Sequence, residues 1–61
     1  MNEEISLEHE GEEYIAEYFI HGDTLTVILP NGQNRSTELR GLNEVHATEV
    51  HLRAYFRTLK T

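Results

Sequence analysis

The chain contains 61 residues, carries a formal net charge of −6 and has no cysteine. A chain of this length forms one small domain (1-61) that buries only about 60% of the surface of the unfolded chain, so a lone monomer is marginally stable. Because cysteine is missing, disulfides and thiolate metal sites are excluded as sources of stability, which leaves a histidine/carboxylate site or self-association.

The charge and the apolar residues also limit the partners and the location of the protein. Residues 1–34 contain eight acidic side chains and no Lys or Arg, whereas residues 35–61 contain three acidic and five basic side chains. Binding to a nucleic-acid backbone requires clustered Lys and Arg, so direct binding to DNA or RNA is not expected. No apolar run approaches the roughly 18 residues that span a bilayer, and the acidic N-terminus does not resemble a signal peptide. We therefore expect a cytoplasmic protein with no membrane partner.

Residues 3–39 show the pattern of β-hairpins. Short runs rich in Ile, Val, Thr, Tyr and Phe are separated by the turn sequences EGE, HGDT and PNGQ. Turn residues at this spacing are typical of consecutive antiparallel strands. The sequence therefore predicts four strands, at about 3–9, 12–21, 24–29 and 33–39.

The turns predict which side chains share a face of the sheet. Two-residue turns at Glu10-Gly11 and Gly22-Asp23 and a three-residue loop at residues 30–32 each determine the register of one hairpin. All three turns agree in placing the larger set of apolar residues on one face. This predicted inner face consists of Ile5, Leu7, Tyr14, Ala16, Tyr18, Ile20, Leu25, Val27, Leu29 and Leu39.

The residues from Asn43 onward have the period of a helix. Asn43 is a favourable N-cap and Glu44 lies in the first turn, so a helix is predicted at about 44–59. At about 100° per residue, its apolar stripe is predicted to cover the inner face of the sheet. The fold class is therefore α+β, a four-stranded antiparallel meander with one C-terminal helix (ββββα). The stripe consists of Val45, Leu52, Phe56 and Leu59, with Thr48 and Tyr55 at its margin.

Two groups of apolar residues are left outside this core and are the candidate interfaces. On the outer face of the sheet, a contiguous apolar patch with a polar rim indicates a contact surface, although such residues also simply suit strands. On the back of the helix, small residues allow another helix to approach, although alanine is also the best helix former. The candidate residues are Ile15, Phe19 and Ile28 on the sheet, and Ala47, Val50 and Ala54 on the helix.

No combination of residues indicates catalysis, a metal or a cofactor. His46 and His51 are five residues apart, or about 140° around a helix, whereas two zinc-binding histidines on a helix are usually four apart. No serine lies in a glycine elbow, and neighbouring glutamates on a strand point to opposite faces. We therefore expect no catalytic residues, no metal ligands and no cofactor.

The sequence thus favours a non-enzymatic interaction module that forms a homodimer or binds another protein through the outer sheet face or the back of the helix. One alternative is an accessory protein that binds a small ligand or metal through His and Glu side chains. Another is that the acidic strands imitate nucleic acid. If His46 and His51 border an interface, their protonation around the usual pKa of about 6.5 would tune association.

Overall fold

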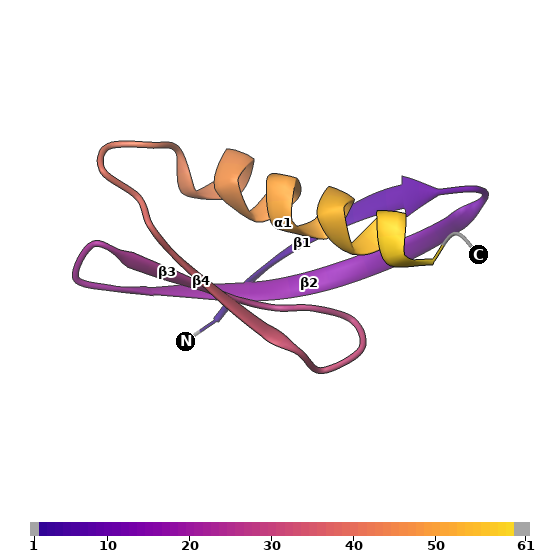
Figure 1. Ribbon diagram of the computed structural model, residues 1–61, viewed down its shortest axis with the longest axis horizontal. Coiled ribbons are helices and arrows are strands. Elements are labelled where there is room, and N and C mark those ends of the chain that lie inside the picture. Colours follow the sequence, from indigo (N-terminus) through magenta and orange to yellow (C-terminus); the bar gives the residue numbers. More distant parts are fainter. Residues whose placement is uncertain (1, 60–61) are drawn as a thin grey trace.

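The computed structural model describes residues 2–59 and shows four strands followed by one helix. The four strands form one antiparallel sheet in the order β1-β2-β3-β4, and the helix lies across one face of it (Figure 1). This is the predicted ββββα fold, and each bound lies within one residue of the expected range. The elements are β1 (Glu3–His9), β2 (Glu12–His21), β3 (Thr24–Ile28), β4 (Asn34–Glu38) and α1 (Glu44–Thr58).

The first two hairpins have the two-residue turns that were predicted. Glu10 and Gly11 have φ angles of 52° and 83°, and positive φ at both central residues is characteristic of a type I′ turn. In the second turn Gly22 has a φ of 64°, as the first position of a type II′ turn requires. Both turn types match the right-handed twist of the strands, so the residues beside them pair directly.

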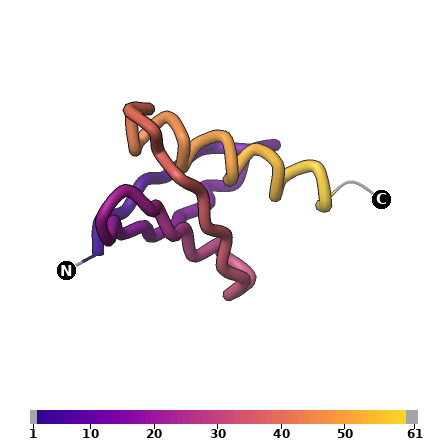
Figure 2. The backbone as a smooth tube through the Cα atoms, turned by 60° about the vertical axis from the view of Figure 1, so that its left-hand side comes forward, coloured from indigo at the N-terminus to yellow at the C-terminus, as the bar shows by residue number. Residues whose placement is uncertain are grey.

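The third hairpin has the predicted three-residue loop. The amide of Leu29 donates to the carbonyl of Gln33 at 2.8 Å, and the amide of Gly32 donates to the carbonyl of Leu29, also at 2.8 Å. This loop lies away from the helix in both views of the backbone (Figures 1 and 2). The three turns together give the predicted pairing, including Leu7 with Tyr14 and Leu25 with Thr37.

The inner face of the sheet is apolar and forms the core with the helix. One predicted member, Ile20, is 39% exposed. It pairs with Leu25 as expected, but β1 pairs with β2 only as far as Tyr18, so within residues 2–59 no β1 residue lies opposite Ile20. The prediction that Ile20 is covered was therefore wrong. The buried residues of the sheet are Ala16, Tyr18, Leu25 and Val27, joined by Leu29 and Leu39 from the adjoining loops, and Ile5, Leu7 and Tyr14 are partly buried against them.

The helix presents a different face to the sheet from the one predicted. Leu52 and Phe56 are buried as expected, but Val45 and Leu59 are each 39% exposed. Ala47, which was expected on the exposed back, is only 7% exposed and belongs to the core. The predicted stripe was therefore wrong at both ends of the helix, and so was the position of Ala47.

Polar contacts explain this rotation of the helix. The His51 ring lies 2.8 Å from the Thr37 hydroxyl in β4, and Ala47 is one turn before His51 on the same side of the helix. Thr48 is fully buried, because its hydroxyl donates to the carbonyl of Glu44 at 2.8 Å and its methyl group can face the core. The contact between His51 and Thr37, which a hydrophobic period does not count, thus helps to orient the helix.

We expect Leu52→Ala to lower the free energy of unfolding by about 2–5 kcal/mol, because it leaves a cavity between the helix and the sheet. Urea unfolding followed by circular dichroism measures this loss. The matched control is Val50→Ala on the exposed back of the helix, where we expect a change within about 0.5 kcal/mol. Equal losses for the two variants would contradict the assigned helix face.

Candidate interaction surfaces

The outer face of the sheet carries a contiguous apolar patch. Ile15 is 50% exposed, Phe19 is 38% exposed and Ile28 is partly buried. Ile28 pairs with Glu17, which lies between Ile15 and Phe19 on the same face of β2, so Ile28 is diagonal to both and within reach of their side chains. Among the described residues, the only helix lies on the opposite face (Figures 1 and 2). We call Ile15, Phe19 and Ile28 the outer patch.

Four carboxylates lie beside the residues of the outer patch, two of them on β1 and two on β2. Glu4 pairs with Glu17 and Glu8 pairs with Glu13, so two pairs of like charges lie directly opposite each other across the strands. Such pairs destabilise a sheet. Among the described residues, the amide group of Asn2 donates a hydrogen bond to Glu17 at 3.0 Å and so stabilises one of the four carboxylates. We call Glu4, Glu8, Glu13 and Glu17 the acidic rim.

The back of the helix carries a second and smaller apolar surface. Val50 is 50% exposed and Ala54 is also exposed, whereas Ala47 is part of the core as described above. Arg53 and Arg57 lie beside these two residues on the exposed side of the helix. The Arg53 guanidinium is 3.9 Å from the Glu49 carboxylate, a long and exposed contact that contributes little. We call Val50 and Ala54 the helix strip, and its surroundings are basic.

The two helix histidines differ in environment and do not both border the helix strip. His46 is exposed in the first turn, where its backbone amide donates to the Asn43 side chain at 2.9 Å. His51 is partly buried against β4, and its Nε2 shares a hydrogen bond with the Thr37 hydroxyl. Burial, and secondarily the positive charge of Arg35, lower the pKa of His51 below its usual value. His51 therefore belongs to the contact between helix and sheet.

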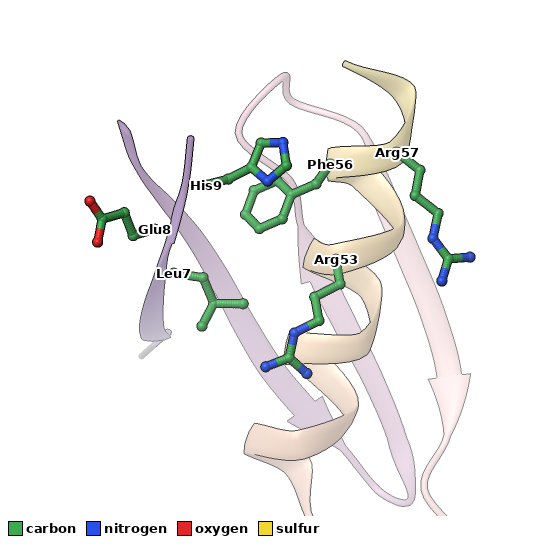
Figure 3. A pocket seen from close by; sticks show the side chains of 6 residues that line it. All are labelled: Leu7, Glu8, His9, Arg53, Phe56 and Arg57. Carbon is green, nitrogen blue, oxygen red and sulfur yellow. The ribbon is translucent and has the colours of Figure 1, made fainter. Parts of the chain in front are cut away.

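A groove that the sequence did not predict runs between β1 and the helix. Its volume is about 450 Å³, and Figure 3 shows the Arg53 side chain extending from the helix over the space beside Leu7. At one end the rings of His9 and Phe56 stack with their centroids 4.5 Å apart. Leu7 and Phe56 were both assigned to the core, so the groove between them was missed. The predicted position of β1 as an edge strand was the sequence signal that could have indicated this groove. The lining residues are Leu7, Glu8, His9, Arg53, Phe56 and Arg57.

Metal binding and membrane crossing have no structural support in the described part of the chain. Within residues 2–59 no three His, Asp or Glu side chains come together in a way that could hold a metal ion. The described helix is too short and too polar to cross a membrane. The surfaces with a recognisable chemical character are therefore the outer patch with its acidic rim, the helix strip and the groove.

The lowered pKa of His51 predicts how stability depends on pH. Above about pH 6.5 this histidine is neutral in both the folded and the unfolded chain. As the pH falls below that value the unfolded chain takes up the proton first, so the free energy of unfolding decreases until the pKa of the folded state is reached. We expect His51→Gln to lose less stability than the original protein between pH 7 and pH 5, measured by urea unfolding.

An identical slope for His51→Gln and the original protein would show that His51 is not buried against β4.

Comparisons with known proteins identify no relative of this chain. No protein-family model matches the chain, and neither a curated protein nor a solved structure is similar enough to count as a match. The function must therefore be argued from the surfaces of this chain.

Proposed function

We propose that the chain is a non-enzymatic interaction module that binds a basic surface of another protein through the outer patch. The observation that carries this proposal is the position of the patch, an exposed group of Ile15, Phe19 and Ile28 on a sheet face that no described element covers. Contiguous apolar patches with a polar border are typical of protein contact surfaces. An exposed aromatic side chain such as Phe19 is a common source of binding energy in such a patch.

The acidic rim supports a basic partner. In the isolated chain the rim carries two cross-strand pairs of like charge, and Lys or Arg side chains of a partner would convert this repulsion into attraction. A symmetric dimer formed by two outer faces would bring two acidic rims together and add to the repulsion. The charges therefore favour a different protein, or a different surface of a second copy, over a dimer of two sheet faces.

A photo-crosslinking experiment tests the proposed surface. Benzoylphenylalanine placed at Phe19 should capture a protein from an extract of the source cells, and the yield should fall as salt is added because the rim contributes electrostatic attraction. The products are identified by mass spectrometry. The matched control places the same group at Val50, which is exposed on the opposite side of the molecule. Capture of the same proteins at both positions would contradict the proposal.

Self-association is a second candidate, supported by the opposite charges of the two surfaces. The outer patch has an acidic rim, whereas the helix strip lies beside Arg53 and Arg57. The outer patch of one copy would therefore complement the helix strip of another. Since the two surfaces lie on opposite sides of the molecule, this contact is head-to-tail and produces chains of molecules instead of a two-fold dimer.

Two complementary variants test self-association. Phe19→Glu blocks the outer patch and Val50→Glu blocks the helix strip, so each variant alone should remain monomeric while the original protein forms oligomers. An equimolar mixture should form a dimer, because each variant retains the surface that the other lacks. Sedimentation velocity measures all four samples. A monomeric original protein at millimolar concentration, or a mixture that stays monomeric, would rule out head-to-tail association.

A further inference from the structure

The two edges of the sheet are protected to different degrees. β4 has five residues and points the charged Arg35 toward the helix side, and both features discourage the addition of another strand. β1 has seven residues, pairs continuously with β2 without a bulge, and points Ile5 and Leu7 toward the helix side. Among the described elements, β1 is therefore the edge that is open to a further strand.

The turn between β1 and β2 determines which backbone groups of β1 are free. His9 and Glu12 flank a two-residue loop and so form a hydrogen-bonded pair, and such pairs alternate along an antiparallel ladder. The backbone N–H and C=O groups of the intervening residues therefore point away from β2. Edge groups of this kind can pair with another chain. The residues concerned are Glu4, Ser6 and Glu8.

The groove gives the open edge a chemical preference. It lies beside β1 on the helix side, with Leu7 and Phe56 providing an apolar floor, the Arg53 side chain extending toward β1 and Arg57 at the margin (Figure 3). A strand added to β1 would direct every second side chain into this groove. Its other side chains would lie beside Glu4 and Glu8 on the outer face, where positive charge is favoured.

We infer that the free edge of β1 binds an extended segment of another protein as a fifth, antiparallel strand. The inward side chains of this segment are apolar, with a carboxylate near Arg53 and Arg57, and its outward side chains next to Glu4 and Glu8 are basic. Backbone hydrogen bonds provide affinity and the alternate side chains provide specificity, as in other cases of strand addition. This site shares Glu4 and Glu8 with the acidic rim but does not use Ile15, Phe19 or Ile28 of the outer patch.

The charges argue against a second copy of this chain as the occupant. Two β1 strands paired antiparallel about Ser6 would place Glu4 of one copy opposite Glu8 of the other, twice in each dimer. Pairing of β1 with β4 of another copy would bring Arg35 to the groove that already contains Arg53 and Arg57. A partner strand with the alternation described above avoids both conflicts.

A peptide built to this pattern is the probe. Acetyl-Glu-Lys-Val-Thr-Val-Lys-Thr-amide places its carboxylate opposite His9 and its lysines opposite Glu8 and Glu4. We expect saturable amide shift changes at Glu4, Ser6 and Glu8 in a two-dimensional NMR titration. A control peptide with every charge reversed should bind at least about tenfold more weakly, since the two cross-strand pairs with Glu8 and Glu4 become repulsive and the first residue then repels the helix arginines. Equal binding of the two peptides, or no binding of either, would overturn the inference.

Two proline variants separate this edge from the opposite one. Ser6→Pro removes an outward N–H from the middle of β1 and should abolish peptide binding. Ser36→Pro makes the same change in the middle of β4, where by the same alternation the N–H also points outward, and should leave peptide binding unchanged. Similar binding by the two folded variants would overturn the inference. A different result is that the original protein forms an oligomer, does not bind the peptide, and loses the oligomer when Ser6 is replaced by Pro. The strand edge would then bind a second copy of the chain, and the inference would be wrong.

A charge exchange gives a test that does not depend on the folding of a proline variant. The exposed residues Arg53 and Arg57 are replaced together by Glu, which should weaken binding of the first peptide at least about fivefold. Replacement of the first peptide residue by Lys should restore it. If the Lys-containing peptide did not regain affinity for the Glu variant, the placement of the carboxylate would be wrong.

Phe19→Glu should leave the affinity for the peptide unchanged. This variant separates the strand site from the proposed function of the outer patch.

Discussion

The register of the three hairpins is the constraint on which the rest of the structure depends. Each turn joins neighbouring strands through two or three residues, and a shift of one residue would move every side chain of a strand to the other face. Leu25 and Val27 of β3, for example, face the helix only because Gly22 permits the tight turn before them. The turns therefore produce one apolar face and one polar face before the helix is added.

A single helix covers only one of these faces, and this determines which surfaces remain for binding. The outer patch lies on the uncovered face, and the groove lies where the helix meets the edge of the sheet. The salt bridges among residues 2–59 join residues close in sequence, namely His9 with Glu10, Glu38 with Arg40 and Glu49 with Arg53. The acidic residues of β1 and β2 and the helix arginines Arg53 and Arg57 therefore do not neutralise each other within residues 2–59, and both charged surfaces remain available to partners.

The strands were predictable from sequence because turns are local, whereas the packing of the helix was not. EGE, HGDT and PNGQ specify their own geometry, so the pairing of Leu7 with Tyr14 and of Ile20 with Leu25 followed directly. The rotation of the helix depends on contacts between distant segments, such as the hydrogen bond between His51 and Thr37, and these leave no periodic signal.

The candidate surfaces were predictable to a similar degree. Ile15, Phe19 and Ile28 were placed correctly on the outer face, because their positions depend only on strand alternation. Ala47 was misplaced because its position depends on the rotation of the helix. The groove was missed because it forms between two elements whose relative position the sequence did not specify.

The most direct test of the account is the solvent exposure of individual side chains, measured by NMR relaxation in the presence of a neutral soluble paramagnetic compound. The structure predicts strong relaxation for Ile15 and Phe19 and weak relaxation for Leu25 and Leu52 in dilute protein. If Ile15 and Phe19 were as protected as Leu25 in dilute solution, the outer face would be covered by the chain itself. The central claim, that one helix leaves this face free for a partner, would then be contradicted.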